Sequence, residues 1–463
     1  MDSPDATAKP LAIVNIVGLS PSVLGEQTPN LNEFRFDRES RTLIPHLPAV
    51  TTTSPSTMLT GTSPAEHGIV ANGWYNRELC EVMFWKQSNR LVQGEKLWET
   101  MRRRDPDATC LNMFWWYNMY SSVDYSVTPR PQYKADGRKI PDCYSWPPDL
   151  RNHLQSKFGR FPLFKFWGPM SSIESSTWII DATIETHRRT DPTLTLGYLP
   201  HLDYAYQHAG PDSDEARRAR VDLDGHFGRL LGYFHDRGVE VMVVSEYVPV
   251  SKPVHINRAL REHGYIEVRE EGGTELLDPG ASRAFAVADH QTAHVYIENP
   301  EDVEPVARLL ESVDGIDLVL DSRSMSELGI AHERSGELLA VADHDAWFTY
   351  YHWLDDARAP DFARTVNIHR KPGYDPVELF IDPEIAFPQL KVLGKLVKKR
   401  LGFRTLMDVI PLDATLVKGS HGRSDAPEEL RPMLIGTDLP PANEGIMPME
   451  AVRDAAMDRL FRG

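Results

Sequence analysis

Short apolar runs alternate along the first half of the chain with longer stretches in which apolar residues recur every three or four positions. The short runs are rich in β-branched residues, which is typical of strands buried on both faces, and the longer stretches are typical of amphipathic helices. We predict strands at residues 13–17, 108–114, 193–199 and 239–245, and helices at residues 94–104, 176–189 and 213–237. Strands alternating with helices predict an α/β fold with a mostly parallel sheet flanked by helices. In such sheets, ligands bind at the carboxyl ends of the strands.

The pattern changes after about residue 250. A compact β-β-α-β unit is predicted from strands at residues 284–288, 294–298 and 316–320 and a helix at residues 303–312. Residues 353–388 are polar and rich in Pro and Asp but also carry many aromatic residues, so we expect an ordered loop over the core. We therefore expect a core of residues 1–250 and 400–463, and a small inserted α+β cap with covering loops at residues 251–399. Beyond Ala426 we expect surface helix and coil.

Charge and composition narrow the possible partners. The chain has 463 residues and a formal net charge of −17, with most basic residues scattered, so no nucleic-acid polymer is expected to bind. No apolar stretch approaches the roughly 18 residues of a membrane span, and the first apolar run is too short for a signal peptide. We expect a cytoplasmic protein, and the sequence does not indicate an oligomeric state. The basic run at residues 391–404 could bind phosphate or lipid headgroups, although a solvated helix face is favoured.

A threonine-rich segment contains the first candidate for chemistry. It reads HLPAVTTTSPSTMLTG over residues 46–61, where Ser54 suits a helix N-cap and Pro55 suits the first helical position. A hydroxyl just ahead of a helix start lies among unpaired backbone N–H groups, which favour anionic ligands and a developing alkoxide. A nucleophilic threonine would be placed here. The alternative is a threonine-rich turn that only caps a helix.

Three motifs around this segment resemble the alkaline phosphatase superfamily, specifically its nucleotide pyrophosphatase/phosphodiesterase branch. They are TPNL at residues 28–31, LTG at residues 59–61 and SPAEHGIVAN at residues 63–72. The resemblance covers about residues 10–250 and 405–425. It implies an alkaline-phosphatase-like core, with Thr51 as the nucleophile. It also implies that Asn72, twenty-one residues further along, helps to hold the phosphate oxygens.

The same resemblance implies a metal centre. In that superfamily two zinc ions are held by three carboxylates and three imidazoles. Three of the six corresponding positions keep a donor, namely Asp203, Glu246 and His421, and three depart from the pattern, namely Val17, Gln207 and Tyr247. The implied cofactor is a divalent metal, zinc first, with an incomplete ligand set. One metal held by Asp203, His421 and a neighbouring imidazole, from His201 or His208, is an alternative, and Asn15 could replace Val17 only weakly.

Other residues are weaker candidates. Trp74 and Tyr75 directly follow Asn72 and could stack on a leaving group such as a base. The HRKPGYD segment at residues 369–375 could close over a phosphate ester. His290 and His294 stand four apart beside a strand, so they are not expected to share a helix face. We expect the other aromatic residues of this region in the core; these are Phe84, Trp85, Phe114, Trp115, Trp116 and Tyr117.

The resemblance thus implies a phosphoric ester hydrolase that acts on a small phosphorylated substrate through a phospho-threonine at Thr51. Two alternatives stay open: a catalytically silent relative that binds a phosphorylated metabolite or partner, and an enzyme with altered single-metal chemistry. We also expect Asp203 and His421, 218 residues apart, to lie within about 8 Å of each other, because only convergence gives either a chemical role.

Overall fold

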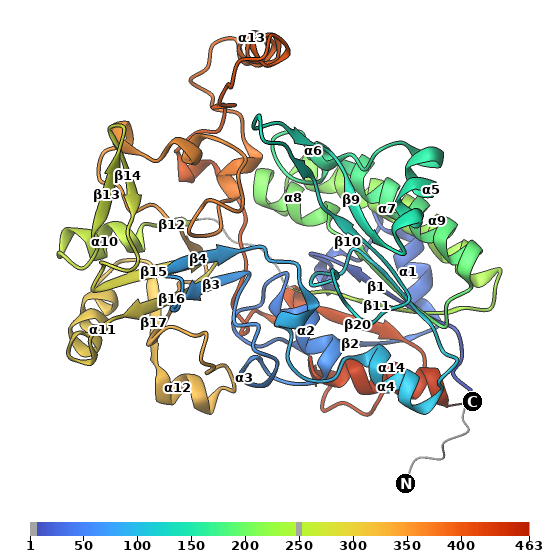
Figure 1. The fold of residues 1–463 in the computed structure, drawn as a ribbon. Coiled ribbons are helices and arrows are strands. Elements are labelled where there is room, and N and C mark those ends of the chain that lie inside the picture. The colour runs from blue at the N-terminus through green and yellow to red at the C-terminus, as the bar shows by residue number, and fades with distance from the viewer. Residues whose placement is uncertain (1–6, 247–251, 463) are drawn as a thin grey trace.

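The computed structural model describes residues 7–246 and 252–462 (Figure 1). In this part of the chain, nine strands form one large sheet in the order β21-β2-β20-β11-β1-β10-β5-β6-β9. Their bounds are β1 (Leu11–Ile16), β2 (Glu39–Ile44), β5 (Cys110–Met113), β6 (Tyr125–Pro129), β9 (Cys143–Trp146), β10 (Leu194–Leu199), β11 (Glu240–Val244), β20 (Met433–Gly436) and β21 (Ile446–Pro448). Strands β11, β1, β10, β5 and β6 run parallel, and β20 and β9 pair antiparallel with their neighbours. The predicted α/β fold is confirmed.

Helices cover both faces of this sheet (Figure 1). One layer contains α1 (Pro29–Phe36), α7 (Ile173–Thr190) and α9 (Asp214–His235), and the other contains α2 (Thr53–Thr60), α4 (Leu97–Arg104) and α14 (Ala451–Phe461). Shorter or peripheral helices are α3 (Pro64–His67), α5 (Pro148–Phe158), α6 (Leu163–Phe166) and α8 (His201–Ala209). Because helices lie on both sides, every residue of β1 and β10 is buried. The predicted strands and helices of this region correspond to β1, β5, β10 and β11 and to α4, α7 and α9.

A second sheet contains the predicted β-β-α-β unit. Strands β15 (Ala284–Asp289) and β16 (Thr292–Ile297) form a hairpin, followed by α11 (Val303–Glu311) and β17 (Ile316–Asp321). A further strand, β18 (Leu338–Ala342), was not predicted and pairs antiparallel with both β16 and β17. The remaining elements are α10 (Ile256–Glu262), α12 (Ser322–Glu327), α13 (Pro388–Arg400) and four small pairs of strands: β3 (Gly73–Asn76) with β4 (Glu81–Phe84), β7 (Gln132–Tyr133) with β8 (Lys139–Ile140), β12 (Lys252–Val254) with β19 (Ala346–Phe348), and β13 (Val268–Glu271) with β14 (Thr274–Leu277).

The residues after Ala426 are not surface helix and coil, so that expectation was wrong. Strand β20 inserts into the large sheet between β11 and β2, and all four of its residues are buried. Helix α14 packs on α2, α4 and β1. A buried strand of four residues is too short to produce a recognisable periodic pattern, which explains the error.

The segment at residues 353–388 folds as short 3-10 turns that pack on the second sheet, as expected for an ordered loop. A buried ion-pair network holds it together, because the Lys371 ammonium lies 2.7 Å from both Asp375 and Glu378. The indole N–H of Trp167 donates to Glu378 at 2.6 Å, which links this segment to the end of α6.

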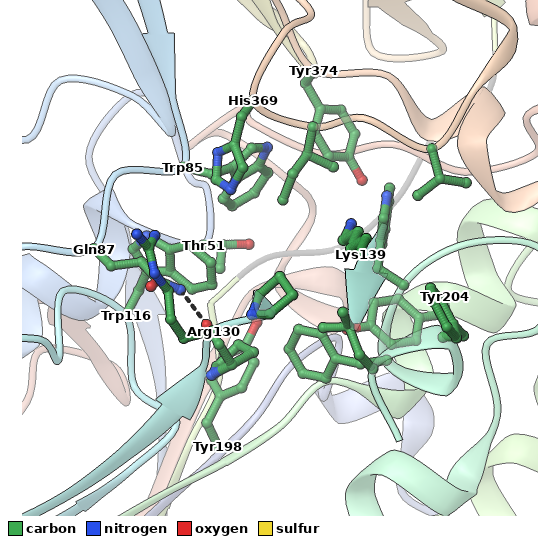
Figure 2. A pocket seen from close by; sticks show the side chains of 18 of the residues that line it. Thr51, Trp85, Gln87, Trp116, Arg130, Lys139, Tyr198, Tyr204, His369 and Tyr374 are labelled. Atoms are coloured by element: carbon green, nitrogen blue, oxygen red, sulfur yellow. Dashed lines mark hydrogen bonds between the residues drawn. The ribbon is translucent and has the colours of Figure 1, made fainter. Parts of the chain in front are cut away.

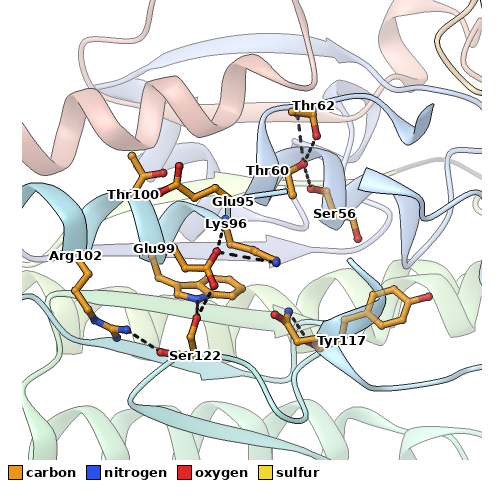
Figure 3. A network of polar contacts seen from close by, with 12 residues as sticks. Ser56, Thr60, Thr62, Glu95, Lys96, Glu99, Thr100, Arg102, Tyr117 and Ser122 are labelled. Atoms are coloured by element: carbon orange, nitrogen blue, oxygen red, sulfur yellow. Dashed lines mark hydrogen bonds and ion pairs between the residues drawn. The ribbon is translucent and has the colours of Figure 1, made fainter. Parts of the chain in front are cut away.

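Polar side chains also fix the start of α4 (Figure 3). The Glu99 carboxylate accepts hydrogen bonds from the Lys96 backbone N–H at 3.0 Å and from the Ser122 hydroxyl at 2.6 Å. The indole N–H of Trp98 donates to the same Ser122 oxygen at 2.9 Å. These contacts cap the helix and attach it to the loop after β5.

The buried position of β20 predicts a clear stability effect. Replacing Leu434 with Ala removes a fully buried side chain from the large sheet and should lower the free energy of unfolding by about 2–5 kcal/mol. The same substitution at Leu401, which is 70% exposed, should change it by less than about 0.5 kcal/mol. Urea denaturation of both variants measures the difference, and equal small effects would place β20 outside the cooperative core.

Candidate active site

Thr51 lies immediately before the first turn of α2 and is almost fully buried. The N-cap residue is Thr52 rather than the predicted Ser54. The Ser54 N–H already donates to the Val50 carbonyl at 3.1 Å, so the helical hydrogen bonds start before Pro55. The Thr52 hydroxyl donates to the Ala71 carbonyl at 2.9 Å. The helix start therefore moves, but Thr51 still lies just ahead of it.

The Asn72 amide connects α2 to the second sheet. Its Oδ1 accepts the Thr52 backbone N–H at 3.1 Å, and its Nδ2 donates to Asp289 Oδ1 at 3.0 Å. The backbone N–H of Asn72 donates to Asp289 Oδ2 at 2.7 Å. The side chain thus faces Thr52 and Asp289 and is 1% exposed. It orients the segment that carries Thr51.

Asp289 and His290 belong to this cluster, and Asp289 was not among the predicted site residues. Burial raises the pKa of Asp289 to about 7, against the opposing effect of the two Asn72 hydrogen bonds. His290 Nδ1 lies 2.7 Å from Asp289 Oδ1, and the His290 ring stacks on the rings of both His421 and Tyr374 with centroids 3.6 Å apart. No local motif marks Asp289, because it meets Asn72 only through the packing of β15.

Asp203 and His421 meet, as predicted, at the carboxyl edge of the large sheet. His421 Nε2 lies 3.9 Å from Asp203 Oδ1. Asp203 is in the first turn of α8, directly after β10, and its Oδ2 accepts a hydrogen bond from Gln207 Nε2 at 2.6 Å. Burial holds the pKa of His421 well below its usual value, and the nearby His290 adds to this effect.

The chain around His421 passes close to the second sheet. The His421 carbonyl accepts the Gln291 N–H at 2.7 Å, and the Gly422 carbonyl accepts the Ala49 N–H at 2.8 Å. Gly422 has a φ of +134°, and a Cβ there would lie 3.1 Å from the Gln291 backbone nitrogen. A glycine is needed for this close approach. The segment thereby links the residues before α2 to the β15–β16 turn.

Glu246 follows β11 and is fully buried. Asn15 Nδ2 donates to its Oε1 at 2.5 Å. Burial raises the pKa of Glu246 well above its usual value; the Asn15 hydrogen bond opposes this shift, and the neighbouring charge of Asp203 adds to it. Tyr247, the next predicted position, lies outside the described residues.

The donors present do not fit the two-zinc centre that the resemblance implies. Val17 is fully buried and offers no lone pair. The Gln207 amide is engaged on both sides, since it donates to Asp203 and its Oε1 accepts the Tyr374 hydroxyl at 2.6 Å. His201 and His208 line a separate cavity, so neither completes a site with Asp203 and His421. Within residues 7–246 and 252–462, no group of three or more His, Cys, Asp or Glu side chains could hold a metal ion.

A pocket opens over Thr51 (Figure 2). In this view His369 and Tyr374 lie above the cavity and Tyr198 lies below it. Burial raises the pKa of Tyr198 well above its usual value. A hydrogen bond with the Thr51 side chain lowers this pKa and so partly opposes the shift. The lining is largely aromatic and consists of Thr51, Trp85, Gln87, Trp116, Pro129, Arg130, Pro131, Tyr133, Lys139, Leu163, Phe164, Phe166, Trp167, Tyr198, Asp203, Tyr204, Val366, Ile368, His369 and Tyr374.

The aromatic residues of the pocket differ from those that the sequence selected. Trp85 and Trp116, which we assigned to the core, line it. Trp74 and Tyr75 do not: the Arg334 guanidinium lies 4.9 Å over the Trp74 ring, and Tyr75 packs edge-on against Phe285 at 5.0 Å. The physical reason is that the β3–β4 hairpin packs on the second sheet and carries Trp74 and Tyr75 with it.

Two basic side chains, Arg130 and Lys139, border the same pocket. Burial lowers the pKa of Lys139, and the nearby Glu378 partly opposes this shift. The pKa of His369 is also lowered by burial. The HRKPGYD segment therefore contributes His369 and Tyr374 to the lining, whereas its Lys371 and Asp375 are buried in the ion-pair network.

A mostly parallel sheet with a buried threonine before a helix, and a pocket at the carboxyl edge, define an α/β protein with an alkaline-phosphatase-like core. A family model described as type I phosphodiesterase / nucleotide pyrophosphatase matches residues 11–375, and the chain belongs to that family. No curated protein is similar enough to the chain to count as a match.

Solved structures share the fold at low sequence identity. Phosphonoacetate hydrolase from Sinorhizobium meliloti 1021, in complex with phosphonoformate, is 14% identical with a TM-score of 0.62, over 97% of this chain and 96% of that one. An inactive variant of murine ectonucleotide pyrophosphatase/phosphodiesterase 5, in complex with AMP, is 13% identical with a TM-score of 0.57, over 98% and 95%. The human protein of the same name is 13% identical with a TM-score of 0.58 over the same shares.

The pKa of Asp289 predicts a pH dependence of stability. Because its folded pKa of about 7 lies above the unfolded value of about 3.9, its contribution is fully present below about pH 4 and is lost as the pH rises through 7. Relative to Asp289→Asn, the free energy of unfolding of the native protein should therefore fall by up to about 4 kcal/mol between those pH values. Urea denaturation across this range tests it, and parallel pH profiles would contradict it.

Proposed function

We propose that the protein hydrolyses a small phosphoric ester through a covalent phospho-threonine at Thr51. The observation that carries this proposal is the position of Thr51, which lines an aromatic pocket directly before the first turn of α2. The partial positive charge of a helix N-terminus favours an anionic phosphoryl group there and stabilises the charge that develops in the transition state. Family membership supports the same reaction class.

The reaction would proceed in two displacements. The Thr51 oxygen attacks phosphorus, a P–O bond forms, and the bond from phosphorus to the leaving oxygen breaks. The Thr51 proton passes to the Asp203 carboxylate, which lines the same pocket. The leaving oxygen departs with the proton that Asp203 received. Water then attacks phosphorus, the bond from phosphorus to the Thr51 oxygen breaks, and a water proton returns to that oxygen through Asp203 while the phosphate group leaves with the new hydroxyl. Asn72 acts here as a positioning residue, because its amide holds the Thr52 N–H and Asp289.

The pocket suits a substrate with a flat organic part. Trp85, Trp116 and Trp167 provide aromatic faces and edges for a ring, and Arg130 and Lys139 provide positive charge for the phosphoryl group. Two similar structures contain AMP and phosphonoformate, and each of these small ligands carries an anionic phosphorus group. A small phosphorylated substrate is therefore proposed. The predicted cytoplasmic location and the expected lack of a nucleic-acid partner stay predictions.

A second candidate function is binding of such a phosphorylated compound without turnover. The specific observation that favours it is the donor set: Val17 carries no ligand atom, the Gln207 amide is already bonded, and burial raises the pKa of Glu246. The single-metal alternative has only Asp203 and His421, without a third ligand among the residues that the structure describes.

Replacing Thr51 with Ala decides between these functions. We expect the variant to lose at least about a thousandfold in turnover of an activated aryl phosphodiester, because the attacking oxygen is gone. Its free energy of unfolding should change by no more than about 1 kcal/mol. Thr53→Ala is the matched control, since Thr53 is a buried threonine of the same helix start that does not line the pocket, and it should keep its activity. Turnover is measured as the nitrophenolate that is released from a nitrophenyl phosphodiester.

The outcomes separate the two candidates. Turnover by Thr51→Ala close to the native rate would reject the covalent intermediate. No turnover by the native protein, with zinc, manganese or iron added in turn, combined with saturable AMP binding in calorimetry, would establish the silent binder. Elemental analysis of the purified protein gives the metal content independently of activity.

A further inference from the structure

Helix α13 leaves an apolar surface uncovered. It projects from the body of the molecule (Figure 1), and none of its residues is buried. Apolar side chains that are 50–70% exposed gather on it and on its flanks, namely Phe387, Leu390, Leu393, Leu396, Val397, Leu401 and Phe403. Such a concentration of exposed large apolar side chains marks an interaction surface rather than a solvated one.

Most of the exposed apolar residues share one face of α13, with Arg400 at its border. Leu390, Leu393, Val397 and Leu401 recur every three or four positions, which places them on one face of the helix. On the opposite side, Lys391 and Lys395 turn back to the chain and form ion pairs with Asp408, at 3.6 Å for Lys391. The apolar face therefore points away from the chain's own contacts.

The charge of this segment distinguishes it from the rest of the protein. Residues 387–407 contain six basic and no acidic residues, in a chain whose net charge is −17. Lys398, Arg400 and Arg404 are free of the Asp408 pairing that engages Lys391 and Lys395. Exposed leucines flanked by lysine and arginine are the pattern of a helix that lies in the interface of an anionic bilayer.

We propose that α13 docks on the surface of an anionic lipid membrane. The apolar face enters the boundary between headgroups and acyl chains, and the basic residues contact the headgroup phosphates. The sequence alone favoured a solvated helix face for this run, and the exposed leucines favour the lipid-headgroup alternative instead. Two copies of α13 would bring like charges together, which disfavours self-association through this face. No helix of the described residues is long and apolar enough to cross a membrane.

The chain after α13 contacts the β7–β8 hairpin. The Arg404 guanidinium donates to the Ala135 carbonyl at 2.9 Å, and Ala135 lies in the β7–β8 hairpin. Tyr133 and Lys139 of that hairpin line the pocket. The segment that follows α13 is therefore bonded to a hairpin that forms part of the pocket wall. The proposal does not depend on the proposed function, since it rests on α13 and its flanks alone.

Flotation of the full-length protein with lipid vesicles tests the proposal. The protein should bind vesicles that contain phosphatidylglycerol, bind those of phosphatidylcholine alone at least about tenfold more weakly, and dissociate as salt is raised. Binding that is absent, or equally strong on neutral vesicles, would overturn the proposal.

Paired variants assign the binding to α13. Lys398→Glu with Arg400→Glu should weaken binding at least about twenty-five-fold, since each basic residue near an anionic surface contributes about a fivefold gain. Leu393→Glu with Val397→Glu should weaken it at least about tenfold, because the apolar face can no longer enter the interface. The matched controls are Leu328→Glu and Arg323→Glu, which are exposed on α12 and its end and should change binding less than about twofold.

The variants also discriminate among other occupants. All four substituted α13 residues are exposed, so the variants should unfold at the same urea concentration as the native protein. If Lys398→Glu with Arg400→Glu lost binding while Leu393→Glu with Val397→Glu kept it, the apolar face would not enter the membrane, and that part of the proposal would be overturned. A dimer in solution that Leu393→Glu with Val397→Glu dissociates, without any vesicle binding, would assign the face to a second copy and overturn the membrane proposal.

Discussion

The buried Asn72 amide is the contact on which the candidate site depends. It binds the Thr52 N–H at the start of α2 and the Asp289 carboxyl at the end of β15, and so it joins the large sheet to the second one. Because the three groups are buried, removing one would leave the others without partners in a nonpolar environment, at a cost of about 1–3 kcal/mol for each group. Through this contact Thr51 is held in a fixed position relative to His290 and His421.

Burial, more than charge pairing, determines the electrostatic character of the site. The pKa values of Glu246 and Asp289 are raised and those of His290 and His421 are lowered, all chiefly by desolvation. Desolvation disfavours the charged form of each of these groups, whereas a centre for two dications needs ionised carboxylates. Thr51 thus lies before α2 beside a donor set that departs from the implied two-zinc centre, and this departure is the reason for proposing both hydrolysis and binding without turnover.

The β7–β8 hairpin connects the pocket to the segment that follows α13. The hairpin contributes Tyr133 and Lys139 to the pocket and accepts the Arg404 contact that follows α13. An aromatic pocket next to an exposed amphipathic helix is an arrangement in which binding at a surface and binding of a small ligand can occur side by side.

The sequence by itself determined the α/β fold, the strands that carry the site, the family, and the place of Thr51, because these depend on local periodicity and on motifs at fixed spacing. It also predicted that Asp203 and His421 converge. Only the tertiary structure decided that Trp85 and Trp116 line the pocket while Trp74 does not, that Asp289 binds Asn72, and that β20 is a central strand. These facts depend on which surfaces pack together across hundreds of residues, and neighbouring residues in the sequence contain no signal for them.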